Sequence, residues 1–202
     1  MKKLTCCPSI QEDGSKIPQE DFASLMKKTS DTHGENFKYT GSYEDIALKI
    51  KEMIPAWQVE IGKFFSLVLF NYLFANGDAH LKNFSVQQTK DGDYVLAPAY
   101  DLINTSLHTN DEDFALEKGL SETMGKSSIY ESKGHPYQDD FITFGKLIGL
   151  SETRIKKIMQ LFLVEQSKVL ELIENSFLEA KQKRMYLSSY RERLSRLQRK
   201  SE

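Results

Sequence analysis

The chain has 202 residues, of which 40% are hydrophobic, 28% charged and 11% aromatic, and its formal net charge is −2. This length predicts one domain, since domains typically have ~100–200 residues. The composition excludes an intrinsically disordered chain, a collagen-like repeat and a small disulfide scaffold. The two cysteines, Cys6 and Cys7, are adjacent, which disfavours a disulfide between them. Two cysteines alone cannot complete a zinc site. Without a signal peptide or an apolar run of ~20 residues, the sequence predicts a cytoplasmic protein that does not enter a membrane.

The N-terminal part of the chain predicts an irregular segment followed by a helix. Residues 1–17 show no periodic pattern, and we expect the folded domain to occupy residues 18–202. Pro18 is followed by Gln-Glu-Asp, and proline and acidic residues favour the first turn of a helix. This pattern predicts a helix that runs to about Lys28, followed by a polar connection.

Two further helices precede the most informative part of the sequence. Ser42, with Asp45 three residues later, predicts a helix cap, and the helix ends before Pro55. Between Trp57 and Asn76, apolar residues occur on nearly every face of a helix, so this helix should be buried nearly all round. A buried helix fixes the position of the loop that follows it.

A small antiparallel hairpin is predicted after that loop. Residues 83–87 alternate between apolar and polar, residues 90–93 form a turn signal, and residues 94–97 read as a second strand that ends at Pro98.

The C-terminal half predicts helices and a basic tail. Residues 103–135 predict loops with a short helix or strand, and apolar stripes predict helices from Pro136 onward, with Ser151 as the N-cap of one long or two shorter helices. A last helix is predicted over 179–199. Eight basic residues and one acidic residue between Lys181 and Lys200 give a local charge of +7, against −9 for the rest. We interpret this as a solvated amphipathic helix and expect no direct DNA binding, because no aromatic platform accompanies the charges.

Three oxygen-bearing side chains have the spacing that phosphoryl transfer requires. Asn83 follows Asp78 by five residues, and Asp101 follows Asp78 by 23 residues. Kinases use one aspartate to orient and deprotonate the attacking hydroxyl, and an asparagine and a second aspartate to hold the metal ions that bridge the nucleotide phosphates. The hairpin would return the chain so that the three groups converge. The competing interpretation is a simple Asn-Gly-Asp turn. Lys82 has the positive charge to neutralise a transferring phosphate, and in a strand-like arrangement His80, two positions earlier, would face the nucleotide as well. The alternative role of His80 is a structural hydrogen bond to the backbone.

The same residues carry a family resemblance. Asn76-Gly-Asp-Ala-His-Leu-Lys-Asn-Phe84, with Pro98-Ala-Tyr-Asp-Leu102, resembles the C-terminal lobe of HipA-type serine/threonine kinases, the toxins of bacterial toxin–antitoxin pairs. Gln19-Glu-Asp-Phe22 resembles another segment of that family, and the resemblance runs from about residue 15 to about residue 175. It implies a mainly α fold, a kinase C-lobe helical bundle with one small β-hairpin between the catalytic loop and the metal-binding aspartate.

The resemblance also implies roles for individual residues and partners. Asp78 would be the catalytic base, and Asn83 and Asp101 would bind Mg²⁺. The residues implied to bind ATP are His80, Lys82, Asn83, Tyr100 and Asp101. The implied partners are a protein substrate, such as an aminoacyl-tRNA synthetase, a helix-turn-helix antitoxin, and a separate chain that supplies the N-lobe.

One feature of a complete kinase is missing from these residues. The glycines before Asp78 are isolated, so the sequence shows neither a glycine-rich phosphate loop nor a lysine in a strand context. We therefore expect a C-lobe fragment, a split-gene subunit or a degenerate relative, with little activity alone. Two alternatives stay open: a non-catalytic module that binds an antitoxin or an N-lobe chain, and a small-molecule phosphotransferase. The Ala-His-Leu-Lys insert between Asp78 and Asn83 disfavours the second alternative.

Overall fold

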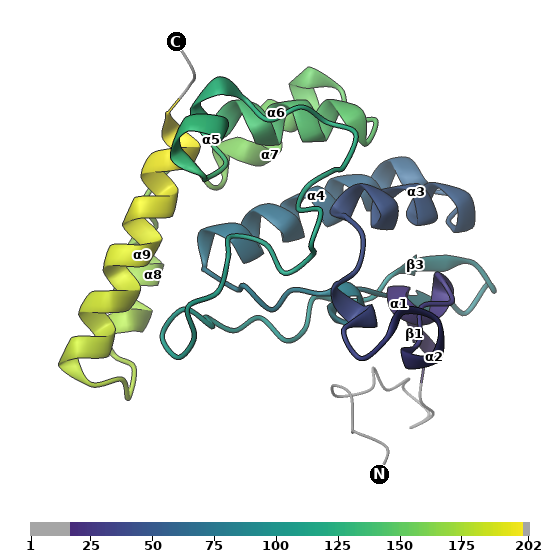
Figure 1. The fold of residues 1–202 in the computed structure, drawn as a ribbon, viewed down its shortest axis with the longest axis horizontal. Coiled ribbons are helices and arrows are strands. Elements are labelled where there is room, and N and C mark those ends of the chain that lie inside the picture. Colours follow the sequence, from purple (N-terminus) through teal and green to yellow (C-terminus); the bar gives the residue numbers. More distant parts are fainter. Residues whose placement is uncertain (1–16, 200–202) are drawn as a thin grey trace.

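A computed structural model describes residues 17–199, and the predictions for Cys6, Cys7 and residues 1–16 lie outside the described residues. Helices dominate the described fold, and a small antiparallel sheet lies at one end (Figure 1). The mainly α prediction is therefore confirmed. The strands are β1 (Gln19–Asp21), β2 (Ser85–Gln88) and β3 (Tyr94–Leu96). The helices are α1 (Phe22–Leu25), α2 (Ser30–His33), α3 (Tyr43–Met53), α4 (Trp57–Leu73), α5 (Ser128–Lys133), α6 (Gln138–Leu147), α7 (Glu152–Gln160), α8 (Ser167–Glu174) and α9 (Ala180–Gln198), with 3₁₀ turns η1 (Phe37–Tyr39) and η2 (Leu81–Asn83).

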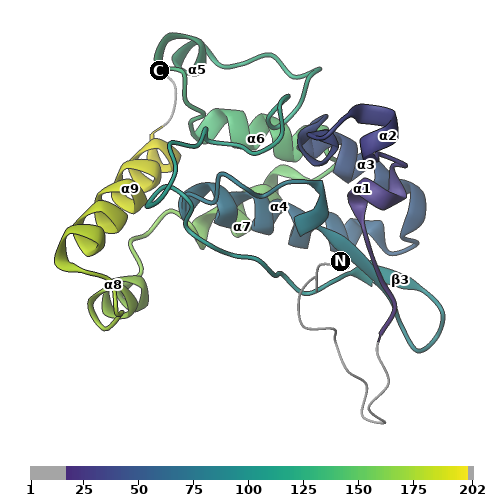
Figure 2. The ribbon, with the colours of Figure 1, turned by 60° about the horizontal axis from the view of Figure 1, so that its bottom comes forward.

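Helix α4 is the centre of the hydrophobic core. It packs against α3, α7 and α9 (Figure 2), and the loop that contains Asp78 follows its C-terminal end. Its side chains Phe64, Phe65 and Leu69 are fully buried, each with 0% exposure. Burying one such side chain stabilises the fold by about 1.5–3 kcal/mol. The prediction of a helix buried nearly all round is confirmed, but the helix ends at Leu73 instead of Asn76, because Ala75 takes a left-handed backbone with φ +55°.

The N-terminal segment forms a strand where a helix is predicted. Gln19–Asp21 pairs antiparallel with β2, and the Phe22 amide donates a hydrogen bond to the Phe84 carbonyl at 3.1 Å. Only residues 22–25 are helical, and Asp21 caps this turn by accepting a hydrogen bond from the Ser24 amide. The helix expected from Pro18 to Lys28 is therefore wrong, since sheet pairing outweighs the local helix signals. The predicted hairpin of β2 and β3 is confirmed and gains β1 as a third strand, in the order β1-β2-β3.

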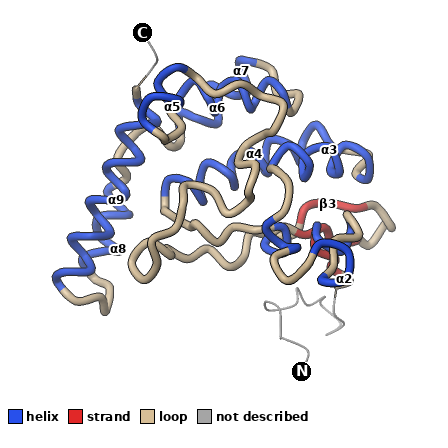
Figure 3. Tube along the Cα trace, in the orientation of Figure 1, coloured by secondary structure: helices blue, strands red, loops and turns tan. Residues whose placement is uncertain are grey.

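The caps predicted from sequence are present. Ser42 and Asp45 form a reciprocal capping box at the start of α3, and Ser151 accepts a hydrogen bond from the Arg154 amide at the start of α7. The region after Ser151 forms two helices, α7 and α8, so the shorter-helix alternative holds. Between β3 and α5, residues 97–127 run as loop and turn (Figure 3).

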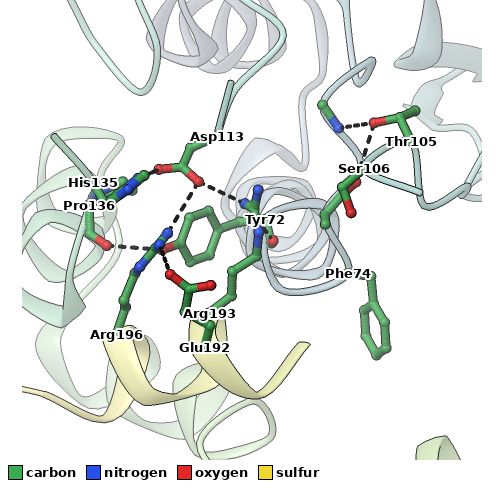
Figure 4. A network of polar contacts seen from close by, with 12 residues as sticks. Tyr72, Phe74, Thr105, Ser106, Asp113, His135, Pro136, Glu192, Arg193 and Arg196 are labelled. Carbon is green, nitrogen blue, oxygen red and sulfur yellow. Dashed lines mark hydrogen bonds and ion pairs between the residues drawn. The ribbon is translucent and has the colours of Figure 1, made fainter. Parts of the chain in front are cut away.

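Helix α9 directs part of its positive charge into the molecule. Arg193 lies 2.9 Å and Arg196 3.5 Å from Oδ1 of Asp113, while His135 lies 2.7 Å from Oδ2 (Figure 4). Both arginine side chains are only 11% exposed, so the helix is amphipathic but not simply solvated on its basic side. Arg193 also donates to the Tyr72 carbonyl in the last turn of α4, at 3.2 Å. Within residues 17–199, the helices are all too short or too polar to cross a membrane.

Candidate active site

The loop after α4 is held by one buried asparagine. Nδ2 of Asn76 donates to Oδ1 of Asn71 at 2.8 Å and to the carbonyl of Asp101 at 3.1 Å. Oδ1 of Asn76 accepts a hydrogen bond from the amide of Asp78 at 3.3 Å. Asn76 therefore connects the end of α4 to both candidate aspartates. Asn76 is 4% exposed and its bond to Asn71 is buried, whereas its partners at Asp101 and Asp78 are more accessible to water.

A second segment fixes the loop from the outside. The Gly77 amide donates to Oγ1 of Thr105 at 2.9 Å, and the Thr105 amide donates to the Ala75 carbonyl at 3.1 Å. A Cβ atom at Gly77 would lie 2.3 Å from the Cβ atom of Asp111. Only glycine therefore allows the chain around Asp111 to approach the loop this closely.

Asp78 has one oriented and one open carboxylate oxygen. The Tyr39 hydroxyl donates to Oδ1 at 2.7 Å, whereas Oδ2 lies 4.0 Å from Nε2 of His80, beyond hydrogen-bonding distance. Burial, the hydrogen bond to Asp78 and the nearby negative charges raise the pKa of Tyr39 to about 12, so the phenol remains a donor at neutral pH. The Asp78 side chain is 40% exposed. Its orientation and its exposure fit a base that accepts a proton from an incoming hydroxyl.

Asn83 and Asp101 lie in direct contact. Nδ2 of Asn83 donates to Oδ2 of Asp101 at 2.6 Å, while Oδ1 of Asn83 accepts from the His80 amide at 3.1 Å. Asp101 has a left-handed backbone with φ +55°, a conformation that costs a non-glycine residue energy and that clusters at functional sites. Carboxylate and amide oxygens are the ligands that Mg²⁺ prefers, with further positions left for water and phosphate. In this arrangement the Asn83 nitrogen faces Asp101 while the Asn83 oxygen is held by the His80 amide, so a shared metal ion requires the Asn83 amide to turn; the metal role of the pair stays a prediction.

Lys82 and Tyr100 are engaged by the surrounding fold. Nζ of Lys82 lies 2.7 Å from Oδ2 of Asp21, the residue that caps α1. The Tyr100 hydroxyl donates to the Lys82 carbonyl at 2.7 Å and contacts the hydroxyl of Ser85. Tyr100, which follows β3, thus contacts both η2 and the first residue of β2. The charged end of Lys82 lies beside the last residue of β1. Their predicted roles at the ATP phosphates stay predictions.

His80 is a neutral residue in this environment. Burial, and then the positive charge of Lys38, lower its pKa to about 4. Its ring packs edge-on against Tyr39, with centroids 5.2 Å apart, and within residues 17–199 its Nδ1 atom has no hydrogen-bond partner. At neutral pH, His80 therefore brings no charge to a phosphate and acts through packing and shape.

The structure thus brings Asp78, Asn83 and Asp101 to one loop cluster, as their spacing predicts, and adds residues that sequence reasoning missed. Tyr39 lies in a polar connection with no motif, so no sequence signal marks it. Asp21 lies in the segment that the sequence predicts as a helix start. The family resemblance of Gln19–Phe22 was the one sequence signal that this residue lies near the site.

A helical lobe with a small sheet and this loop cluster defines a kinase-related domain. The chain belongs to the family of the HipA-like C-terminal domain, whose model matches residues 9–170. A curated Haemophilus influenzae protein named "Putative kinase" is 30% identical over 182 residues, which cover 86% of this chain and 52% of that protein. The chain therefore spans about half the length of that relative.

Two solved structures share the fold. One is the Shewanella oneidensis toxin–antitoxin system of HipA, HipB and operator DNA, with a TM-score of 0.59 and 16% identity over 90% of this chain and 44% of that chain. The other is the Helicobacter pylori proinflammatory kinase CtkA, with a TM-score of 0.56 and 17% identity over 93% of this chain and 70% of that chain. At these identities the likeness concerns the fold.

Proposed function

We propose that the chain is the catalytic C-lobe of a serine/threonine protein kinase of the HipA type, which transfers phosphate from Mg–ATP to a protein hydroxyl. The observation that supports this most is that Asn76 joins the backbone of Asp78 to the backbone of Asp101, whose carboxylate contacts Asn83. Family membership and the name of the Haemophilus relative support the same chemistry.

Each residue of the loop cluster has its own role in the proposed phosphoryl transfer. Oδ2 of Asp78 accepts the proton of the acceptor hydroxyl, and the Tyr39 hydroxyl fixes the carboxylate through Oδ1. Asn83 and Asp101 would hold the metal ion, and Mg–ATP, when bound, supplies the phosphoryl group. Asn76 keeps the base and the metal-binding aspartate in register, because it bonds to the backbone of both.

The proposed partners follow from the family and its neighbours. The Shewanella structure contains HipB and operator DNA, which supports an antitoxin partner for this chain. By resemblance, that antitoxin is a helix-turn-helix protein, and the substrate is a protein such as an aminoacyl-tRNA synthetase. A separate N-lobe chain is a further proposed partner.

Nucleotide binding by the purified 202-residue chain tests the proposal. We expect weak binding of a fluorescent ATP analogue that requires Mg²⁺ or Mn²⁺ and that falls at least about tenfold in Asp101→Asn, because the variant loses a charged metal ligand while asparagine tolerates the left-handed backbone. Asp91→Asn, an exposed acid in the hairpin turn, is the charge-matched control and should bind as wild type does.

A phosphorylation assay completes the test. We expect the chain alone to transfer phosphate only slowly, since oriented phosphates provide much of the rate and the 202 residues contain no glycine-rich loop before Asp78. Asp78→Asn should retain nucleotide binding and abolish transfer. Nucleotide binding that ignores both the metal and Asp101→Asn would contradict the proposed site and favour a non-catalytic binding module.

A further inference from the structure

A lysine side chain lies beside the candidate base. Lys38 belongs to η1, and its Nζ atom lies over the ring of Tyr39, 4.7 Å from the ring centroid. The hydroxyl of the same ring donates to Oδ1 of Asp78 at 2.7 Å. Within residues 17–199, the Lys38 ammonium group forms no hydrogen bond and no ion pair. Its positive charge therefore remains free for a ligand that enters beside the catalytic loop.

The turn that carries this lysine is fixed against the loop. The Tyr39 carbonyl accepts a hydrogen bond from the Glu117 amide at 2.9 Å, and the Phe37 side chain packs against the hydrophobic core. The turn η1 also contacts η2, the turn that contains Asn83. Lys38 therefore extends from a backbone that is held in place beside the candidate site, and only its own side chain has to move to reach a ligand.

The charges at the loop leave a need for this cation. The two candidate aspartates are negative, and Lys82 shares its charge with Asp21 at 2.7 Å. His80 adds no charge at neutral pH, because burial and then the charge of Lys38 lower its pKa to about 4. That effect also shows that the charge of Lys38 reaches the loop. A nucleotide phosphate placed beside two carboxylates is repelled by them unless a nearby cation offsets the repulsion.

We propose that Lys38 binds the transferring phosphate of the nucleotide. The inference rests on the proposed function and adds to it a residue that touches the substrate. In that transfer, the acceptor oxygen bonds to phosphorus, the bond from phosphorus to the leaving ADP oxygen breaks, and the acceptor proton goes to Asp78. The phosphate must therefore lie next to the hydroxyl at Asp78, within the space that the free ammonium group adjoins. Lys38 stays protonated and forms no covalent bond.

A comparison of two nucleotides tests this contact without turnover. The probes are ADP and the non-hydrolysable ATP analogue in which an NH group bridges the last two phosphates, each with Mg²⁺, titrated into the full chain. Lys38→Met removes the charge and keeps an apolar stem over Tyr39. We expect it to weaken the analogue by at least about tenfold and ADP by less than about twofold, since only the analogue has the terminal phosphate. Lys38→Arg keeps the charge and should bind the analogue within about threefold of wild type.

Lys90→Met is the matched control. It removes the same charge from an exposed position in the hairpin turn, and it should change the affinity for either nucleotide less than about twofold. Thermal melts show that each variant is folded before it is titrated. Equal losses in Lys38→Met and Lys90→Met would show a general charge effect and overturn the proposal. A Lys38→Met variant that loses ADP and the analogue equally, or neither of them, would overturn it as well.

The outcome is separable from that of the proposed function. If binding of the analogue depends on Asp101 but not on Lys38, the catalytic proposal stands and the phosphate contact fails. If Lys38→Met removes the preference for the analogue while Asp78→Asn transfers phosphate as wild type does, the phosphate contact stands and the role of Asp78 fails. A chain that binds neither nucleotide contradicts both.

Discussion

Replacing Asn76 by alanine should damage stability and the candidate site together. The side chain makes three hydrogen bonds, to Asn71, to the Asp101 carbonyl and from the Asp78 amide. Alanine removes all three without a steric clash. The variant therefore tests whether the loop is held by this residue, as the contacts indicate.

The magnitude follows from the burial of each partner. Asn71 is 5% exposed, and leaving its Oδ1 without a donor in the interior costs about 1–3 kcal/mol. Asp101 is exposed and Asp78 is half-buried, so water replaces most of those two bonds, at roughly 0.5–1 kcal/mol each. The total is about 2–5 kcal/mol, a large part of a typical stability of ~5–15 kcal/mol. For a chain of this size, it corresponds to a fall in Tm of roughly 4–20 °C.

Urea and thermal unfolding, followed by circular dichroism, measure this loss, and Mg-dependent nucleotide binding reports the site. Asn110→Ala, at an exposed loop position, is the control and should melt within about 1 °C of wild type. We expect Asn76→Ala to bind nucleotide more weakly even where it is fully folded, since the Asp101 backbone loses its tether. If Asn76→Ala has the same Tm as Asn110→Ala and binds nucleotide as wild type does, then Asn76 does not hold the loop.

Three further predictions concern the core, the base and pH. Val68→Asp should lower the unfolding free energy by several kcal/mol, or prevent folding, because it leaves a charge in the fully packed centre of α4; a melt close to wild type would exclude α4 as the core. Asp78→Ala should change Tm by no more than a few degrees, or raise it, since a carboxylate held for chemistry contributes little to stability; a large fall in its melt would make Asp78 a structural cap. His80 has a folded-state pKa of about 4, below its usual ~6.5, so the unfolded chain binds a proton more readily than the folded one. The contribution of the neutral His80 to the unfolding free energy is therefore complete above pH ~6.5 and should fall by about 1–2 kcal/mol by pH 5. His80→Gln should lose that part of the pH dependence in urea titrations, whereas the exposed His108→Gln should retain it.

The fold was predictable wherever one local pattern decided it. The apolar run of α4, the Ser42 and Ser151 caps and the turn at residues 90–93 each determine their structure through neighbours in sequence. The segment after Pro18 shows the limit. Its helix signals are real, but the strand forms because its backbone groups find partners on β2, which lies more than 60 residues away. Such pairing leaves no local pattern.

The site divides in the same way. The spacing of Asp78, Asn83 and Asp101 predicted their convergence, and the structure brings them together on one loop cluster. The sequence did not predict the role of Tyr39, because no motif surrounds this residue. Its hydroxyl reaches Asp78 only after the chain has folded. Nor did it predict that Lys82 would pair with Asp21. Both contacts depend on how α1, η1 and the sheet pack around the loop.

The contacts of the loop separate its scaffold from its chemistry. Asn76 bonds to backbone groups at both aspartates, and Tyr100 bonds to the Lys82 carbonyl, so these two side chains determine geometry. The two aspartates differ from them, because Asp78 keeps an open oxygen and Asp101 is exposed. Substituting a scaffold residue must therefore change stability and ligand binding in parallel, whereas substituting either carboxylate should change function with little change in unfolding free energy. Two distinct groups in a plot of melting temperature against nucleotide affinity would bear out this division, and a single line through all variants would contradict it.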